Sequence, residues 1–194
     1  MSFRIENKIL VNKDNFYEFN KFLKENSAKT LFPKRKIKSL YFDNSNYQMF
    51  DDSEEGCLPR KKIRVRHYPG TSDVLNLEIK VSSVEGKFKT SHKLNKEKFI
   101  LYQKKGLSDN LYGWCKPVIW TEYLRNYYQI EDYRITYDTN IQYLNVSEVL
   151  IGKESSSVLE IKASANADLD KLDYLFPNSK TRFSKFSNAI RFLR

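Results

Sequence analysis

A short motif with alternating charged and apolar residues recurs along the chain and constrains its fold more than any other feature. Leu-Glu-Ile-Lys occurs at residues 77–80 and again at residues 159–162, and a related Ile-Glu-Asn-Lys stands at residues 5–8. In an extended strand, residues two apart point to the same face, so each motif places a carboxylate beside an ammonium. Ile79 and Ile161 face the other way. The chain is therefore expected to form a sheet with a charged face and an apolar face.

Further strands and several helices accompany these motifs. Alternation predicts strands at residues 3–11, 39–43, 61–68, 75–82, 87–93, 118–128, 133–138 and 158–163. Helical spacing and capping signals predict helices at residues 13–25, 95–105 and 168–176, a last helix after Phe186, and a helix or loop at residues 44–55 that ends at Gly56. We expect one α+β domain over residues 1–194, built around an antiparallel sheet or barrel.

The charge of the chain points to a polyanionic partner. Lys and Arg number 34 against 24 Asp and Glu, which gives a formal net charge of +10. This charge alone does not separate nucleic acid from nucleotide, polyphosphate or an anionic membrane. No signal-peptide core and no run of about 20 apolar residues is present, so we expect a soluble, cytoplasmic protein without a transmembrane segment. Cys57 and Cys115 lack the spacing of a disulfide framework or a zinc site.

One face of the predicted strands collects most of the charge. Its residues are Arg4, Glu6, Lys8, Arg64, Arg66, Glu78, Lys80, Arg125, Arg134, Thr136, Asp138, Glu160 and Lys162. In one arrangement these faces look outward into water, and the mixed signs form cross-strand pairs. In the other, the sheet closes into a barrel with the charged faces inside and helices over the apolar faces. A cationic interior of this kind requires a neutralising ligand, and a triphosphate or longer phosphate chain would serve.

Eight motifs in series match those of a known family. They are Arg-x-Glu-x-Lys at 4–8, Ser-Leu-Tyr-Phe-Asp at 39–43, Lys-Ile-Arg-Val-Arg at 62–66, Leu-Glu-Ile-Lys at 77–80, Tyr-Leu-Arg at 123–125, Arg-Ile-Thr-Tyr-Asp at 134–138, Leu-Glu-Ile-Lys at 159–162 and Phe-Ser-Lys-Phe at 183–186. Together they resemble the VTC (vacuolar transporter chaperone) polyphosphate polymerase domain of the CYTH-like triphosphate tunnel metalloenzyme superfamily. The resemblance covers nearly the whole chain in the expected order.

The resemblance implies a closed antiparallel β-barrel, the triphosphate tunnel, with helices packed on the outside. It further implies transfer of the γ-phosphate of ATP to a growing polyphosphate chain, with release of ADP. ATP and polyphosphate are then the partners, and Mn²⁺ or Mg²⁺ is the cofactor.

The same resemblance assigns roles to individual residues. The catalytic cations are Arg64, Arg66, Lys80 and Lys185. The other phosphate-binding residues matched by motif are Lys8, Arg125 and Arg134. Arg182 stands where the family often has a lysine, so the charge is kept but the geometry is not. Lys93 is a further phosphate-binding candidate from its place after the second strand, and Ser184 could contact phosphate or equally cap the last helix. The metal ligand is Glu160. The superfamily signature Glu-x-Glu-x-Lys has Arg4 in place of its first glutamate here, which favours phosphate binding over a second metal.

Two alternative functions stay open. A tunnel triphosphatase would hydrolyse inorganic triphosphate or a nucleotide, and Arg4 counts against it. A non-catalytic polyanion-binding module is compatible with the charge and the aromatic content. The signature of an RNA-recognition domain is absent, so no specific nucleic acid is expected, and no protein partner is assigned.

Overall fold

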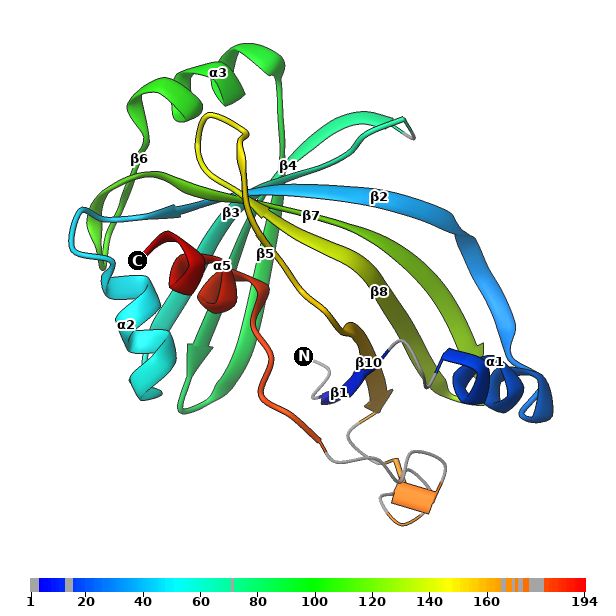
Figure 1. Cartoon of the computed structure of the whole chain (residues 1–194). Helices are drawn as coiled ribbons and strands as arrows, with labels where there is room; N and C mark the ends of the chain where they lie inside the picture. Colours follow the sequence, from blue (N-terminus) through cyan, green and yellow to red (C-terminus); the bar gives the residue numbers. More distant parts are fainter. Residues whose placement is uncertain are drawn as a thin grey trace. The chain divides into compact units, whose positions relative to one another are not determined.

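Antiparallel strands make up most of the computed structural model, which describes residues 4–12, 16–70, 72–164, 167–168, 170, 173–174 and 180–194 (Figure 1). The strands are β1 (Arg4–Val11), β2 (Lys29–Asp43), β3 (Arg60–Tyr68), β4 (Ser72–Ser83), β5 (Gly86–Leu94), β6 (Leu107–Asp109), β7 (Gly113–Ile130), β8 (Tyr133–Leu144), β9 (Leu150–Lys153) and β10 (Ser157–Ser164). The helices are α1 (Phe16–Glu25), α2 (Gln48–Glu55), α3 (Lys96–Lys105) and α5 (Lys185–Leu193). The expected α+β class is confirmed.

The chain divides into two compact units. Unit 1 comprises residues 1–35, 124–141 and 154–183, and unit 2 comprises residues 36–123, 142–153 and 184–194. The long strands β2, β7 and β8 each contribute residues to both units.

The strands are hydrogen-bonded in the order β1-β10-β8-β7-β2-β3-β4-β5, with β6 on β7 and β9 on β8. This order has two ends, and no ladder joins β1 to β5 among the described residues. The expected closed barrel is therefore wrong, because the sheet is open. The backbone carbonyl of Lys8 on β1 instead accepts a hydrogen bond of 2.8 Å from the backbone N–H of Thr181. That edge of β1 is thus met by the segment before α5.

In unit 1, helix α1 packs on the apolar face of β1, β10 and β8. The register places Ile9 opposite Leu159, and Ile161 opposite Ile135. Phe19 and Leu23 of α1 join these residues in one buried cluster. Burying apolar side chains of this size stabilises the unit, and it leaves the charged residues of the same strands on the opposite face.

In unit 2, α2 and α5 pack against each other, as Figure 1 shows. Phe186 of α5 stacks on Tyr41 of β2 with 5.1 Å between ring centroids. The Asp43 carboxylate at the end of β2 accepts hydrogen bonds of 3.0 Å from the backbone N–H groups of Met49 and Phe50, and so caps the start of α2. Gly56 ends α2 with a φ of 83°, a conformation that glycine adopts without a steric penalty.

Most of the predicted elements are confirmed. Helix α3 begins after Asn95, whose side chain accepts a 2.9 Å hydrogen bond from the Lys98 backbone, and ends before Gly106. Strand β2 starts at Lys29, ten residues before its predicted start, so the basic run before Ser39 belongs to the strand. The predicted helix at 168–176 lies largely outside the described residues. Within the described part of the chain, every helix is too short or too polar to cross a membrane.

Candidate functional site

The charged face of unit 2 gathers cations from four elements. In the register of β3, β4 and β5, Arg64 lies opposite Glu78, Lys62 opposite Lys80, and Lys80 opposite Lys89. Directly opposed residues share a face, so these side chains project to one side. We call these five residues, together with Arg66 on the same face of β3 and two residues at the start of α5, the cationic cluster. Its members are Lys62, Arg64, Arg66, Glu78, Lys80, Lys89, Ser184 and Lys185.

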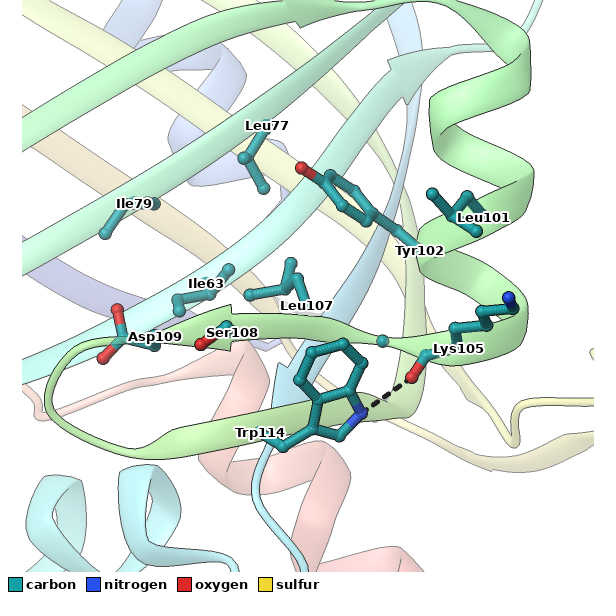
Figure 2. Close-up of a pocket in the computed structure, with 11 residues that line it drawn as sticks. Ile63, Leu77, Ile79, Leu101, Tyr102, Lys105, Leu107, Ser108, Asp109 and Trp114 are labelled. Atoms are coloured by element: carbon teal, nitrogen blue, oxygen red, sulfur yellow. Dashed lines mark hydrogen bonds between the residues drawn. The ribbon is translucent and has the colours of Figure 1, made fainter.

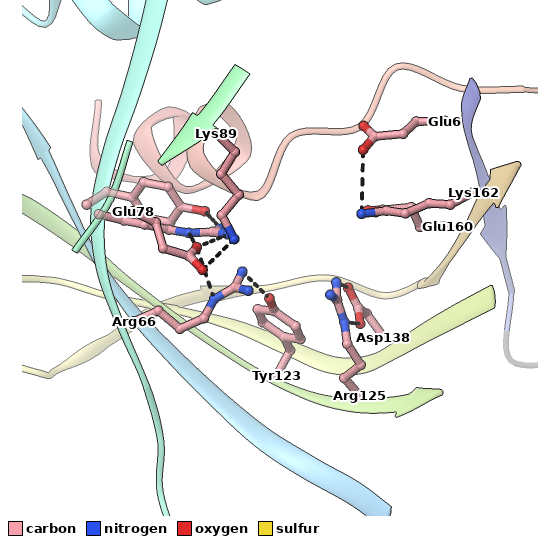
Figure 3. Close-up of polar contacts among 11 residues, drawn as sticks. Glu6, Arg66, Glu78, Lys89, Tyr123, Arg125, Asp138, Glu160 and Lys162 are labelled. Atoms are coloured by element: carbon pink, nitrogen blue, oxygen red, sulfur yellow. Dashed lines mark hydrogen bonds and ion pairs between the residues drawn. The ribbon is translucent and has the colours of Figure 1, made fainter. Parts of the chain in front are cut away.

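Glu78 is the anion at the centre of the cationic cluster (Figure 3). Its carboxylate accepts from Arg64 Nε at 2.7 Å and from Lys89 Nζ at 2.6 Å, and Arg66 Nε lies 3.6 Å away. The Arg64 guanidinium also donates to the Tyr41 hydroxyl at 2.8 Å. Glu78 is 5% exposed and Arg66 is 8% exposed. These two residues therefore do not belong to a solvated outer face, which was one of the arrangements that the sequence left open.

The cations around Glu78 hold it in its ionised form. Burial alone would raise the pKa of Glu78, but Arg64, Arg66 and Lys89 lower it to about 2. Burial would lower the pKa of Arg64, and Tyr41 and Glu78 more than reverse this and raise it. Burial also lowers the pKa of Lys89, and Glu78 offsets only part of that change. One carboxylate therefore faces three cations, and the cluster keeps an excess of positive charge.

The N-terminus of α5 adds a hydroxyl and an ammonium group to the cationic cluster. Ser184 Oγ accepts from the backbone N–H of Ser187 at 3.2 Å, which makes Ser184 the N-cap, and it also accepts from Lys62 Nζ at 2.8 Å. Lys185 Nζ lies 4.5 Å from the centre of the Tyr123 ring, and the Tyr123 hydroxyl accepts from Arg66 at 3.2 Å. A helix N-terminus beside ammonium groups is a favourable setting for an anion.

Several buried polar atoms on this face have no hydrogen-bond partner among the described residues. They are Arg66 Nε, Ser39 Oγ and Thr121 Oγ1. Ser39 lies opposite Arg66 in the ladder between β2 and β3. Buried donors and acceptors are nearly always satisfied in folded proteins, so unsatisfied ones at one place indicate a polar ligand or water. The chemistry of this face, with guanidinium, ammonium and hydroxyl donors, fits phosphate oxygens.

Unit 1 carries a second charged group of side chains, shown in Figure 3. Strands β1 and β10 pair so that Glu6 lies opposite Lys162 and Lys8 lies opposite Glu160. Lys162 Nζ is 3.0 Å from a carboxylate oxygen of Glu160 and 3.5 Å from one of Glu6. We call these four residues the ionic quartet. Lys8 Nζ also donates to the carbonyl oxygen of Phe183 at 2.7 Å.

Arg125 forms a two-point ion pair with a fully buried aspartate in unit 1. Its Nε and Nη2 atoms donate to the two carboxylate oxygens of Asp138 at 2.5 and 2.7 Å. Such bidentate pairs are strong and fix the orientation of the guanidinium. Arg125 therefore sits in a defined position, with part of its donor capacity engaged by Asp138.

The predicted site residues fall in both units. Arg64, Arg66, Lys80, Ser184 and Lys185 lie together in the cationic cluster. Lys93 lies opposite Asn76 and so shares their face, but its side chain is exposed. Lys8 and Glu160 belong to the ionic quartet, Arg134 lies opposite Lys162 on an adjoining strand, and Arg134 and Arg182 are exposed.

The sequence interpretation missed the central role of Glu78 and assigned no role to Lys62, Lys89, Tyr41 or Tyr123. Lys62 is part of the quoted motif at residues 62–66, and Lys89 alternates with Lys87 and Lys93 on one face of β5. This alternation of lysines in the sequence could have indicated that Lys89 lies on the charged face.

The carboxylates fit a metal that is held mainly by phosphate. Among the described residues there is no group of three or more His, Cys, Asp or Glu side chains that could hold an ion. Glu160 and Glu6 approach the same ammonium group, so two carboxylates lie close together. Mg²⁺ and similar ions are commonly bound by one or two carboxylates plus substrate phosphates and water. This donor set therefore fits a metal that enters with the substrate.

The opposite face of β3 and β4 contributes to a separate, largely apolar pocket (Figure 2). Its volume is about 530 Å³, and Ile63, Leu77 and Ile79 form one wall. Trp114 also lines the pocket, and its indole N–H donates to the carbonyl oxygen of Lys105 at 2.8 Å. This lining is mostly apolar and combines one lysine, Lys105, with the acidic Asp109, so it lacks the several cations that a chain of phosphates would require. We therefore place the candidate site on the charged face.

Replacing Ser184 by alanine tests the N-terminus of α5. We expect the free energy of unfolding to fall by about 1 kcal/mol, because the N-cap hydrogen bond is lost. The contact from Lys62 is lost as well. Urea unfolding of the wild type, Ser184→Ala and Ser184→Thr would measure the change, and threonine should retain most of the stability. Equal stability of the alanine variant would contradict this capping role.

Comparisons with known proteins identify a family and several similar folds. The family model described as "VTC domain" matches residues 3–194. No curated protein matches the chain. A candidate adenylate cyclase from Bacillus halodurans has a similar structure, with a TM-score of 0.63 and 14% identity over 94% of each chain. A candidate adenylate cyclase from Vibrio parahaemolyticus has a TM-score of 0.60 and 12% identity over 98% of each chain.

A third similar structure is a candidate adenylyl cyclase from Hippeastrum that has a dominant triphosphatase activity. Its TM-score is 0.63 at 12% identity, over 97% of this chain and 96% of that chain. At such identities these likenesses show the fold.

Proposed function

The chain belongs to the VTC domain family, and we propose that it transfers the γ-phosphate of ATP to a growing polyphosphate chain and releases ADP. The observation that carries this proposal is the cationic cluster. Arg64, Arg66 and Lys89 surround one carboxylate, and Lys62, Lys80 and Lys185 add further positive charge on the same face. A ligand with several adjacent phosphates would neutralise this excess charge.

Phosphoryl transfer suits a site built from cations without a nucleophilic side chain. The reaction depends mainly on alignment of the two reacting groups and on stabilisation of charge on the transferred phosphoryl group. We assign Arg64 and Arg66 to the phosphate oxygens, because a guanidinium can donate to two oxygens at once. Lys80 and Lys185 supply compact charges, and Lys93 and Ser184 are further proposed contacts.

The proposed transfer forms one bond and breaks another. An oxygen of the terminal phosphate of the acceptor chain forms a bond to the γ-phosphorus of ATP. The bond between that phosphorus and the bridging β,γ oxygen breaks, and ADP leaves with the electron pair. Lys8, Arg125, Arg134 and Arg182 of unit 1 remain proposed phosphate ligands. A divalent ion, Mn²⁺ or Mg²⁺, would be held by Glu160 and would offset negative charge on phosphate oxygens.

A tunnel triphosphatase is the second candidate, since a protein of the same fold from Hippeastrum has a dominant triphosphatase activity. The two reactions differ only in the acceptor, which is water in one and a phosphate chain in the other. The absence of turnover would leave the third candidate, a non-catalytic polyanion-binding module.

One assay separates these functions. The purified chain is incubated with ATP and Mn²⁺, and ADP, free phosphate and chain product are followed together. We expect ADP to appear with long-chain polyphosphate and little free phosphate. Free phosphate in equal amount to ADP, without chains, would establish the hydrolase instead. No ADP at all would contradict both transfer from ATP and hydrolysis of ATP.

A further inference from the structure

The ionic quartet of unit 1 places one ammonium group in contact with two carboxylates. Lys162 Nζ contacts a carboxylate oxygen of Glu160 at 3.0 Å and one of Glu6 at 3.5 Å. Both oxygens therefore lie close to the same point, and a single cation can contact both of them. We propose that Lys162 is an internal counter-ion that keeps free divalent metal from binding at Glu6 and Glu160.

The strand register accounts for this geometry. Each strand carries a Glu-x-Lys pair, and β1 and β10 run antiparallel with Glu6 opposite Lys162 and Lys8 opposite Glu160. The two carboxylates are therefore diagonal neighbours, each flanked by a lysine of its own strand and a lysine of the other. The quartet has two negative and two positive charges, so it is neutral without any metal. A divalent ion that entered beside both lysines would add charge to a neutral group.

Among Lys162, Glu6 and Glu160, the lysine has the side chain that can move most easily. Its side chain is 32% exposed, whereas those of Glu6 and Glu160 are 23% and 14% exposed. A lysine side chain has a long, flexible stem and can carry its ammonium into water or onto another anion. A phosphate chain offers such an anion. The metal and the phosphates would then be accepted together, with Lys162 shifting from the carboxylates to a phosphate oxygen.

The contact distances also explain why the ammonium does not imitate a metal. Mg²⁺ holds its oxygen ligands at about 2.0 to 2.1 Å, closer than either contact of Lys162. A metal bound at such distances would take the place of the ammonium between the carboxylates, so metal binding requires the ammonium to leave. The free protein is expected to bind divalent metal weakly, and removal of the lysine charge is expected to strengthen that binding.

The test measures metal binding directly, in the absence of nucleotide. Mn²⁺ is titrated into the full chain, and free Mn²⁺ is followed by its electron paramagnetic resonance signal. Lys162→Met removes the charge and keeps the length of the side chain, and we expect it to bind Mn²⁺ at least about 10-fold more tightly than the wild type. Lys162→Arg keeps the charge and should bind as weakly as the wild type.

Two controls locate the effect. Lys21→Gln removes an exposed lysine of unit 1 that pairs with Glu25 on α1, and it should leave Mn²⁺ binding unchanged. The double variant E160Q/K162M should lose the gain, because one of the two carboxylates is gone. If Lys162→Met does not fold, Lys162→Gln gives the same readout with a polar side chain.

The outcomes are distinct from those of the activity assay. The inference rests on the proposed function only in taking Glu160 as the metal ligand. Equal Mn²⁺ binding by wild type and Lys162→Met would overturn it, even if the wild type makes polyphosphate. Tighter binding that survives in E160Q/K162M would also overturn it, because the metal would then lie elsewhere. A gain that depends on Glu160 would support it whether the protein transfers or hydrolyses phosphate.

Discussion

Replacement of Arg64 by alanine is expected to lower the rate of ATP turnover by about 1000-fold or more, because a guanidinium on the transferred phosphoryl group supplies stabilisation of that size. Arg64 is held in place from two sides. Its Nε donates to Glu78 at 2.7 Å and its Nη1 donates to Tyr41 at 2.8 Å. An arginine fixed in this way meets the substrate with little loss of side-chain freedom.

The measurement is steady-state ATP turnover by purified variants, together with circular dichroism to confirm that each one folds. Arg64→Lys keeps the charge but not the planar fork, and it should retain more activity than alanine. Arg191→Ala is the matched control, since Arg191 pairs with Glu54 on the surface of unit 2 and is 60% exposed. Turnover of Arg64→Ala at the wild-type rate would rule out the cationic cluster as the reaction site.

Replacement of Glu78 by glutamine should have the largest effect on stability. The carboxylate side chain is 7% exposed and lies among Arg64, Arg66 and Lys89. Its neutralisation would leave these cations close together and poorly compensated, which typically costs about 3 to 5 kcal/mol for a buried pair. Urea unfolding at neutral pH would measure this loss. Glu25→Gln, a change at an exposed carboxylate, should leave the stability unchanged.

The effect of Glu78→Gln should depend on pH. The pKa of Glu78 is lowered from its usual 4.5 to about 2 in the folded protein. A group with a lowered pKa in the folded state stabilises the protein above the pKa of the unfolded state, and this contribution is lost as the pH falls toward the folded value. The difference in stability between wild type and variant should thus be full above pH 4.5 and shrink toward pH 2. A difference that does not change with pH would contradict the charge role.

Inorganic triphosphate offers a link from this stability to function. If phosphate oxygens bind the same cations, the ligand replaces part of the missing negative charge in Glu78→Gln. Triphosphate should then raise the melting temperature of the variant more than that of the wild type. An equal rise in both proteins would mean that the ligand binds away from Glu78.

The two faces of the strands could be predicted from the sequence because their alternation is local. A period of two residues determines which side chains share a face, whatever the strand pairs with. The same period occurs in open and closed sheets, so the pattern could not show that no ladder joins β1 to β5 in the described part of the chain. Whether a sheet closes depends on contacts between residues far apart in the chain. At β1 such a contact is the hydrogen bond from the backbone N–H of Thr181 to the carbonyl oxygen of Lys8.

The sequence pattern also could not predict that the two Leu-Glu-Ile-Lys motifs have different surroundings. Glu78 faces two arginines of β3, whereas Glu160 contacts Lys162 of its own strand. Identical tetrapeptides thus have different environments because different strands pair with them. The sequence also could not show which lysine of β5 contacts Glu78. Lys87, Lys89 and Lys93 all lie on the same face of β5 as Glu78 does on β4, and the register of the two strands brings Lys89 to Glu78.

Protection of individual lysines by a phosphate chain tests the location of the site most directly. The wild-type protein is treated with an amine-acetylating reagent with and without polyphosphate, and modification is quantified for each lysine by mass spectrometry. We expect polyphosphate to protect Lys62, Lys80, Lys89 and Lys185, and to leave the exposed Lys34 and Lys116 equally modified in both samples. Equal modification of the cluster lysines with and without polyphosphate would contradict the proposal that this face binds the phosphate chain.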